Sequence, residues 1–396
     1  MNQKELPVVH VVNGRQKKLL QGHPWVYGNE IESVEGEPED GALVTVVDFR
    51  GRYMGTGFYN SKSLITVRLL THRQEEITDA LIASRVKAAC EYRRFVMSRP
   101  GTDSCRLIYG EADRLPGVIA DRFGRVIVLQ VLALGMERFT QVIADALIEC
   151  EKPDCLLLQN DDAIRRKEGM ECFTRVLHGT LPEENIIHEN GIKLAVDVLG
   201  GQKTGYFLDQ KDNHLFVRQF CKDARVLDCF SYIGAFALNA AAAGAKEVTA
   251  VDISEAAVKL IEKNAALNDA DITAVCANCF DFLRAQVKAG EKYDVVVLDP
   301  PAFTKAHANM ASACRGYKEI ALSAMRLLPA GGVLATHSCS YHMPEEVFVN
   351  TVLSAAQDLH RQVRIITLRR QDIDHPVLAG YPESHYLKSL WLQMLD

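Results

Sequence analysis

The amino-acid sequence predicts an α/β protein whose C-terminal part is a doubly wound, mostly parallel sheet, preceded by a small β-barrel and a middle α+β domain. Two observations carry this prediction. From about residue 220, strand-like and helix-like segments alternate, which is typical of a parallel sheet covered by helices. Before residue 72, short strand-like runs are punctuated by glycines, which favours a small all-β unit. A chain of 396 residues has room for both.

Residues 1–72 are predicted to form the β-barrel. A short helix over 15–21 ends before Gly22-His23-Pro24, because glycine and proline interrupt the helical pattern there. The acidic run 30–40 contains Gly36 and Pro38 and is predicted to be an exposed loop. The predicted strands cover 8–12, 42–48, 53–59 and 64–70.

Residues 73–190 are predicted to form the middle α+β domain. Apolar residues at helical spacing predict helices over 75–97 and 137–149. Tight turns at Leu115-Pro116-Gly117 and Arg122-Phe123-Gly124 predict an antiparallel meander. The strands of this domain are predicted over 106–109, 118–121, 126–131 and 155–159.

Residues 191–396 are predicted to form the doubly wound domain. Its strands are expected over 225–228, 247–252, 273–276, 295–299, 332–338 and 361–369. The helices between them are expected over 234–243, 255–268, 280–289, 311–328 and 344–359. A final stretch, 386–395, is predicted to add an antiparallel strand at the edge of the sheet.

The composition predicts an ordinary globular protein. It is 48% hydrophobic and 24% charged, and no segment approaches the roughly 20 apolar residues of a membrane span. No apolar leader follows the N-terminus and the eleven cysteines are scattered, so we expect a cytoplasmic protein with free thiols and no membrane partner. A net charge of -6 argues mildly against a nucleic-acid partner. The basic cluster near the N-terminus, Arg15, Lys17 and Lys18, is by itself best explained as a solvated face, but several basic clusters before the last domain weakly favour contact with phosphates.

Two acidic residues predict a nucleotide-type cofactor site in the last domain. Asp228 ends the first predicted strand and Asp252 ends the next, and ligands of such sheets bind at the carboxyl ends of the strands. Gly234 allows the backbone to approach a ligand, and Asp252 can accept hydrogen bonds from both ribose hydroxyls. The G-x-G-x-x-G fingerprint of dinucleotide folds is missing, which favours a cofactor without a pyrophosphate. Asn278 either reads an adenine edge or caps the following helix.

The segment Asp299-Pro300-Pro301-Ala302-Phe303 follows the fourth predicted strand. Two prolines make this loop stiff and leave it few hydrogen-bond donors. Such a loop can direct a carbonyl or carboxylate towards a flat base or amide, with Phe303 available for stacking.

Cys339 lies between two serines just after the fifth predicted strand, and therefore at the same edge as Asp299. Carbon 5 of a pyrimidine is a poor nucleophile. A thiolate that adds to carbon 6 makes carbon 5 able to attack a methyl sulfonium group. The position of Cys339 therefore favours pyrimidine methylation, and Asp299 can hydrogen-bond the ring nitrogen that gains charge.

A metal site is not expected. Cys276 and Cys279 form a lone C-x-x-C pair with no second pair of ligands at a zinc-like spacing. The spacing of His337, Cys339 and His342 fits no common site either.

The motifs together resemble the bacterial large-subunit ribosomal RNA cytosine-C5 methyltransferases of the RlmI type, over the whole chain. Gly22 to Tyr27 is similar to the start of their N-terminal PUA domain, an RNA-binding module, and Arg106 to Gly117 to the signature of their middle domain. Gly201 to Gln210 is similar to the segment that precedes their Rossmann-like domain and covers the cofactor. The resemblance implies S-adenosylmethionine as cofactor, large-subunit ribosomal RNA as partner and a possible homodimer.

The motifs and the resemblance together give a set of expected site residues. The catalytic residues are Cys339, as nucleophile, and Asp299. The cofactor-binding residues are Tyr206, Asp209, Gln210, Asp228, Phe230, Gly234, Asp252, Ile253, Asn278, Phe280 and Asp299. The substrate-binding residues are Lys203, Pro300, Pro301, Phe303, Arg15, Lys17 and Lys18.

Three positions depart from the family pattern. Pro301 stands where many RNA cytosine-C5 methyltransferases have a second cysteine that releases the enzyme, so release must use another base. Asn278 stands where relatives often have Asp, and His337 is an unfamiliar neighbour of the Ser-Cys-Ser segment.

Two other functions fit parts of the pattern. The Asp299-Pro300-Pro301 loop is close to a loop that accepts exocyclic amines, which favours an amino-methyltransferase of guanine or adenine, for which Cys339 would be dispensable. A non-catalytic RNA-binding assembly factor would keep the domains without the chemistry, but the intact Asp228, Asp252 and Asp299 argue against it.

Overall fold

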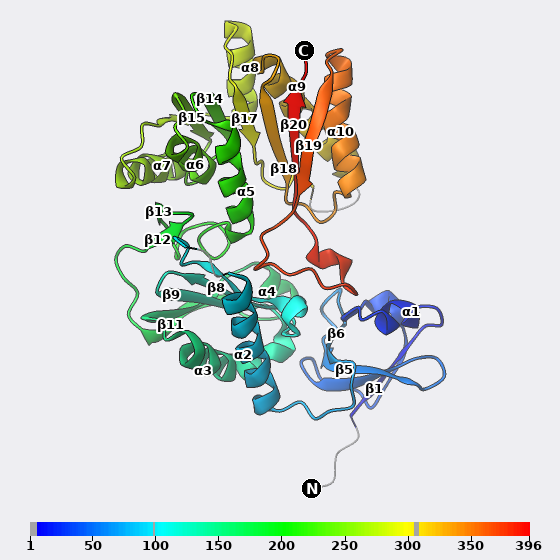
Figure 1. Cartoon of the computed structure of the whole chain (residues 1–396). Coiled ribbons are helices and arrows are strands. Elements are labelled where there is room, and N and C mark those ends of the chain that lie inside the picture. Colours follow the sequence, from blue (N-terminus) through cyan, green and yellow to red (C-terminus); the bar gives the residue numbers. More distant parts are fainter. Residues whose placement is uncertain (1–5, 98–99, 305–308) are drawn as a thin grey trace.

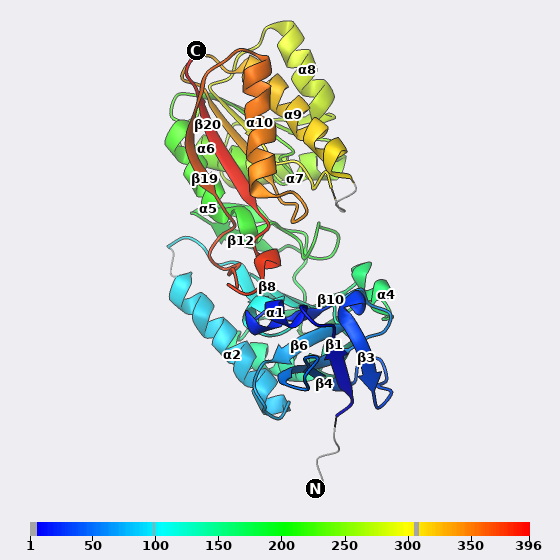
Figure 2. The same ribbon diagram turned by 90° about the vertical axis from the view of Figure 1, so that its right-hand side faces the viewer.

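A computed structural model describes residues 6–97, 100–304 and 309–396. The chain forms a seven-stranded sheet, a six-stranded sheet and a five-stranded sheet, besides a two-stranded hairpin. Figure 1 shows that the seven-stranded sheet and its helices lie in the upper half of the molecule, and the six- and five-stranded sheets in the lower half. Figure 2 shows the same division from the side.

The N-terminal sheet has six strands in the order β2-β6-β5-β4-β1-β3. Its strands are β1 Val8–Val11, β2 Trp25–Val26, β3 Ile31–Glu35, β4 Leu43–Val47, β5 Tyr53–Tyr59 and β6 Val67–Thr71, with one short helix, α1 Gln16–Leu20. The inward-facing residues of alternating strand positions, such as Val9, Val11, Val44 and Val46, form a small separate core.

The middle sheet has five strands in the order β11-β10-β9-β8-β7, and β7, β8 and β9 form the predicted antiparallel meander. Its strands are β7 Cys105–Tyr109, β8 Val118–Phe123, β9 Val126–Val131, β10 Cys155–Asn160 and β11 Phe173–Gly179. Its helices are α2 Asp79–Val96, α3 Thr140–Glu151 and α4 Ile164–Lys167. A two-stranded hairpin, β12 Ile186–Glu189 and β13 Ile192–Ala195, leads to the last domain.

The C-terminal sheet has seven strands in the order β16-β15-β14-β17-β18-β20-β19. They are β14 Arg225–Cys229, β15 Glu247–Asp252, β16 Thr273–Cys276, β17 Val295–Leu298, β18 Val333–Ser338, β19 Val363–Arg369 and β20 Lys388–Met394. The helices are α5 Lys211–Phe216, α6 Ala235–Ala242, α7 Glu255–Leu267, α8 Cys279–Ala289, α9 Met310–Leu327 and α10 Glu345–Asp358. The doubly wound fold class is thus confirmed.

Helices cover both faces of this sheet because its central strands are apolar on both sides. Val295, Val296, Val297 and Leu298 of β17 are all buried, as expected for a strand with helices above and below. Helices α8, α9 and α10 pack on one face, and α5, α6 and α7 lie on the other (Figures 1 and 2).

The segment 370–387 between β19 and β20 leaves the upper half and reaches the lower one, where it is drawn in red in Figure 1. The ring of Tyr381 lies 4.8 Å from that of Trp25, and the Glu383 carboxylate lies 3.2 Å from the Nε2 atom of His23. Arg93 of α2 donates to the carbonyl of Asp374 at 3.0 Å. This segment therefore ties the C-terminal domain to both other parts of the chain.

Two sequence predictions were wrong. The last strand, β20, is antiparallel as expected but lies between β18 and β19, so β19 is the edge strand. Every residue from Leu387 to Leu392 is buried, as expected for an internal strand that is covered on both faces. The acidic run 30–40 is not all loop, because Ile31–Glu35 pairs with β1 despite its exposed acidic side chains.

No helix among the described residues is long and apolar enough to cross a membrane. The domain boundaries at 72 and 190 stay a prediction.

A buried ion pair within the middle sheet, which Thr204 from the C-terminal part also contacts, generates a stability prediction. Arg106 donates to both carboxylate oxygens of Asp121, at 2.8 and 2.7 Å, and Thr204 also donates to Asp121. Asp121→Ala leaves the Arg106 charge buried without its partner, so we expect urea denaturation to show a loss of about 3–5 kcal/mol in the free energy of unfolding. Asp154→Ala removes the exposed Arg125 pair and should change it little. Equal losses in both variants would contradict this account.

Candidate active site

Three candidate site residues meet at one edge of the C-terminal sheet because of its register. Cys229 of β14 pairs with Leu298 of β17, and Leu298 pairs with Thr336 of β18. Asp228, Asp299 and Cys339 stand at or just beyond the carboxyl ends of these strands. Figure 1 shows this edge facing the lower half of the molecule. It is the edge at which open α/β sheets bind ligands.

The turn after β14 has a strained backbone. Phe230, Tyr232 and Gly234 have φ angles of +64°, +50° and +86°. Residues other than glycine rarely adopt this left-handed region, so Phe230 and Tyr232 are strained there. A Cβ atom at Gly234 would also lie 3.3 Å from the Cγ2 atom of Ile261 in α7. Backbone strain of this kind clusters at ligand sites, where the surrounding structure holds it in place.

Asp228 offers an unused acceptor in the interior. Its Oδ2 atom accepts from the Ala237 amide at 3.1 Å, whereas its Oδ1 atom is buried without a partner among the described residues. Burial, with a further contribution from the Asp299 carboxylate, raises the pKa of Asp228 to about 7. A buried carboxylate oxygen without a partner is costly unless a ligand donates to it.

Asp209 offers a second unused acceptor. Its Oδ2 atom accepts from the Tyr386 hydroxyl and lies 3.4 Å from the Lys203 ammonium, but its buried Oδ1 atom has no partner in the described part of the chain. Although burial alone would raise the pKa of Asp209, the charges of Lys203 and His375 hold that pKa well below its usual range. Asp209 is therefore ionised at neutral pH and can receive a cationic group.

Asp299 lies close enough to Asp209 and Asp228 to interact electrostatically with both carboxyl groups. The Gln210 side chain donates from Nε2 to Asp299 Oδ2 at 3.0 Å, and the Asp299 amide donates to the Cys229 carbonyl at 3.3 Å. Burial, together with the charge of Asp209, raises the pKa of Asp299 to about 7. Near neutral pH its carboxyl group is thus partly protonated and can act as a hydrogen-bond donor as well as an acceptor.

Asp252 and its neighbours line the outer part of this edge. The two oxygens of Asp252 accept from the amides of Tyr232 and Ser254, both at 2.9 Å, which fixes the carboxylate and leaves further lone pairs. Ile253 is 67% exposed beside it. Asn278 caps α8 by accepting from the Phe280 amide at 2.9 Å, so the helix-capping alternative is confirmed for its oxygen.

The proline loop after β17 packs its aromatic residue against the domain. Pro300 is buried, whereas Pro301 is exposed. The Phe303 ring lies 4.7 Å from that of Tyr317 and 5.8 Å from that of Phe280. Phe303 is half-buried, so only part of its ring is available to stack on a substrate.

Hydrogen bonds on both sides of Cys339 hold its loop. The Ser338 hydroxyl lies 2.9 Å from that of Tyr317, and the Ser340 hydroxyl donates to the Thr304 carbonyl at 2.8 Å. Burial raises the pKa of the half-buried Cys339 thiol to about 11, against an opposing influence of the Lys203 charge. The thiol needs stabilisation of its anion to act as a nucleophile.

Some residues singled out in the sequence already have partners within the protein or lie away from this edge. The Tyr206 hydroxyl is buried and donates to Glu189 at 3.1 Å, so its own role at the cofactor stays a prediction. Lys18 pairs with Glu30 at 2.6 Å, whereas Arg15 and Lys17 are exposed on the N-terminal domain. His337 is fully buried and stacks on Phe236, and burial lowers its pKa to about 3.

Sequence reasoning missed three residues of this region. The Tyr232 hydroxyl donates to the Gly205 carbonyl at 2.8 Å, which ties the 200–205 loop to the turn after β14. Tyr386 donates to Asp209, and Lys388 donates to the Ser340 carbonyl. The one available signal was a lysine near the apolar residues Leu390, Trp391 and Leu392 of the predicted last strand.

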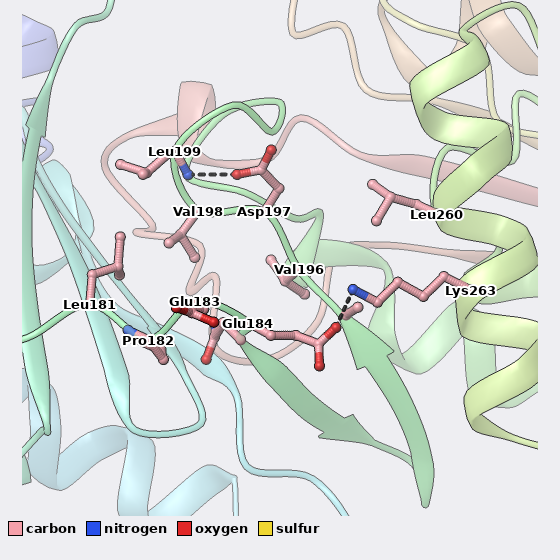
Figure 3. A pocket seen from close by; sticks show the side chains of 12 residues that line it. Leu181, Pro182, Glu183, Glu184, Val196, Asp197, Val198, Leu199, Leu260 and Lys263 are labelled. Carbon is pink, nitrogen blue, oxygen red and sulfur yellow. Dashed lines mark hydrogen bonds and ion pairs between the residues drawn. The ribbon is translucent and has the colours of Figure 1, made fainter.

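A cavity of about 160 Å³ lies apart from these residues, between the 181–199 segment and α7. Figure 3 shows its lining, in which Lys263 of α7 points towards Glu184. None of its lining residues belongs to the predicted site. In the described ranges, no group of three or more His, Cys, Asp or Glu residues is arranged to hold a metal ion.

This edge combines a strained turn, two unused buried acceptors, a carboxyl group with a pKa near neutrality and a thiol. Such a set fits a cofactor that carries an ammonium group and ribose hydroxyls, and a planar substrate beside Asp299 and Cys339.

Comparisons with known proteins agree with this geometry. Residues 9–72 match the family described as a PUA-like domain, and residues 128–371 match the family described as S-adenosylmethionine-dependent methyltransferase. The chain is 42% identical to ribosomal RNA large subunit methyltransferase I of Klebsiella pneumoniae (strain 342), over 98% of each chain. It is 40% identical to the protein of that name from Vibrio campbellii, over 98% of this chain and 99% of that protein.

Solved structures show the same fold. A putative SAM-dependent methyltransferase from Streptococcus mutans superimposes with a TM-score of 0.84 and 20% identity, over 98% of this chain and 99% of that one. A putative methyltransferase complexed with SAH gives a TM-score of 0.84 at 19% identity, with the same coverage.

The family resemblance and the cofactor that it implies are thereby confirmed. A family match over more than half of the chain, and relatives about 40% identical along nearly all of it, show that this chain belongs to the S-adenosylmethionine-dependent methyltransferases and, among them, to the family of ribosomal RNA large subunit methyltransferase I.

Proposed function

We propose that this protein methylates carbon 5 of a cytosine in large-subunit ribosomal RNA, with Cys339 as the nucleophile. The name of its relatives, ribosomal RNA large subunit methyltransferase I, supports the RNA class. The observation that supports the chemistry is the register of β17 and β18, which puts Cys339 and Asp299 at the same sheet edge as Asp228, one of the residues that we propose to bind the cofactor.

The residues of this edge fit the cofactor. The unpartnered Oδ1 atoms of Asp209 and Asp228 suit the ammonium end of S-adenosylmethionine, and Asp252 suits its ribose hydroxyls. When bound, S-adenosylmethionine supplies an electrophilic methyl group on sulfur. Gln210, Phe230, Gly234, Ile253, Asn278 and Phe280 complete the proposed cofactor contacts, and Tyr206 supports them from the buried side.

The chain's own residues supply the activation of the base. The Cys339 thiolate adds to carbon 6 of cytosine, and the electrons that move into the ring make carbon 5 nucleophilic. Asp299, in its protonated form, donates a hydrogen bond to the ring nitrogen that gains negative charge, which its pKa of about 7 permits. Once carbon 5 has been alkylated, loss of its proton to a base and departure of the thiolate restore the aromatic ring.

Substrate contacts are proposed for residues that flank this edge. Lys203 carries a side chain that is 40% exposed, and Pro300, Pro301 and Phe303 form the loop beside Asp299. Arg15 and Lys17 are exposed on the N-terminal domain and suit phosphate contacts, whereas Lys18 would first have to leave Glu30. A homodimer and a cytoplasmic location stay predictions.

Asp252→Ala tests the cofactor site. Loss of the hydrogen bonds to the ribose should weaken S-adenosylhomocysteine binding by roughly 10- to 100-fold, measured by isothermal titration calorimetry. Asp271→Ala is the matched control, because Asp271 is exposed in the loop after α7. An unchanged affinity in Asp252→Ala, in a variant that melts like the wild type, would place the ribose elsewhere.

Cys339→Ala tests the nucleophile. We expect ribosomal RNA that carries 5-fluorocytidine to trap a covalent complex in the presence of S-adenosylmethionine, because fluorine blocks the final proton loss. Gel electrophoresis under denaturing conditions should show the complex with the wild type and with Cys276→Ala, an exposed cysteine, but not with Cys339→Ala. Methyl transfer to normal RNA that survives in Cys339→Ala, without a trapped complex, would favour methylation of an exocyclic amine instead.

A further inference from the structure

Lys388 at the start of β20 differs from the other buried cations. The remaining ones among the described residues each have a carboxylate partner: Arg68, Arg85, Arg93, Arg106, Arg165 and Lys211. Lys388 is only 3% exposed, and its one hydrogen bond in the described part of the chain is to a neutral carbonyl. A buried lysine with no carboxylate bonded to it is costly, which makes Lys388 a candidate for a functional role.

The carbonyl that Lys388 contacts belongs to the Cys339 loop. Its ammonium donates to Ser340 O at 2.6 Å, and its strand pairs with β18 so that Lys388 lies opposite Ser338. Ser340 in turn donates from its hydroxyl to Thr304 O in the loop that follows Asp299. Lys388 thus fixes the backbone on one side of Cys339 and links it to the Asp299 loop.

We propose that Lys388 is a positioning residue for Cys339: its ammonium orients the Cys339 loop through Ser340 and stabilises the Cys339 thiolate. This role rests on the proposed function, in which Cys339 is the nucleophile. It concerns the protonation state of the thiol before any RNA reacts, so it can be measured without methyl transfer.

The charges around Lys388 agree with this role. Burial lowers the pKa of Lys388 to about 8, and the nearby Cys339 and Glu345 oppose that shift, because anionic forms of both favour the ammonium. Glu345 begins α10, His385 lies just before β20, and Arg370 lies just after β19.

Other charges act on Cys339 itself. The positive charge of Lys203 favours the Cys339 thiolate, whereas the negative charges of Asp299 and Asp209 oppose it. The hydrogen bond to Ser340 O holds the Lys388 ammonium beside the residue that follows Cys339, and a positive charge near a thiol favours the thiolate.

A purely structural lysine and a charge-stabilising one make different predictions for Lys388→Gln. The glutamine amide can still donate to the Ser340 carbonyl but carries no charge, whereas Lys388→Arg keeps the charge. The measurement is the rate of Cys339 alkylation by iodoacetamide between about pH 6 and 11, followed by peptide mass spectrometry. The exposed Cys276 of the same molecule serves as an internal reference.

We expect Lys388→Gln to slow Cys339 alkylation about tenfold near neutral pH and to move its pH profile upward by about one unit, with Cys276 unaffected. Lys388→Arg should stay close to the wild type. Lys292→Met is the matched control, since Lys292 also donates to a carbonyl, Arg326 O at 2.7 Å, but is exposed and lies before β17.

The proposal would be overturned if Lys388→Gln melts at the wild-type temperature and the pH dependence of its Cys339 alkylation rate is unchanged. If Lys388→Gln does not fold, the same alkylation profile is measured on Lys388→Met, which fills similar space without a charge. An unchanged profile in that variant would likewise overturn the proposal. A failure of the 5-fluorocytidine trap with a shifted alkylation profile would refute the proposed function while leaving the Lys388–Cys339 coupling intact.

Discussion

The parallel register of β14, β17 and β18 is the constraint on which the rest of the site depends. It aligns Cys229 with Leu298 and Leu298 with Thr336, so the residues that follow these strands meet at one edge. A slip of the register would move these residues away from one another and turn each strand's side chains to the opposite face. The helices on both faces prevent such a slip, because they bury both sides of the central strands.

Two loops from distant parts of the sequence complete this edge and shape its electrostatics. The 200–210 loop brings Asp209 and Gln210, and the segment 370–387 brings Tyr386 onto Asp209. Asp209, Asp228 and Asp299 stand close enough that one carboxylate raises the pKa of the next, while Lys203 offsets the charge of Asp209. The result is one ionised carboxylate, Asp209, that suits a cation, and two partly protonated carboxyl groups, of which Asp299 suits a base.

The sequence predicted what depends on local pattern. The alternation of strands and helices, the meander and the strand-end positions of Asp228, Asp299 and Cys339 follow from periodicity and turn residues. It missed β11, whose mostly exposed side chains give no alternation, and it put β20 at the edge because strand order depends on pairing between distant segments. The hydrogen bond of Tyr386 and the buried position of Lys388 were also beyond reach, since both arise from tertiary packing.

The most direct test of the account is a crystal structure of the protein with S-adenosylhomocysteine. We predict that the ligand's ammonium group lies within hydrogen-bond distance of Asp209 Oδ1 or Asp228 Oδ1, its ribose beside Asp252, and its sulfur on the side of Asp299 and Cys339. A ligand bound elsewhere, such as in the cavity beside Lys263, or at this edge with both orphaned oxygens still unpartnered, would contradict the account.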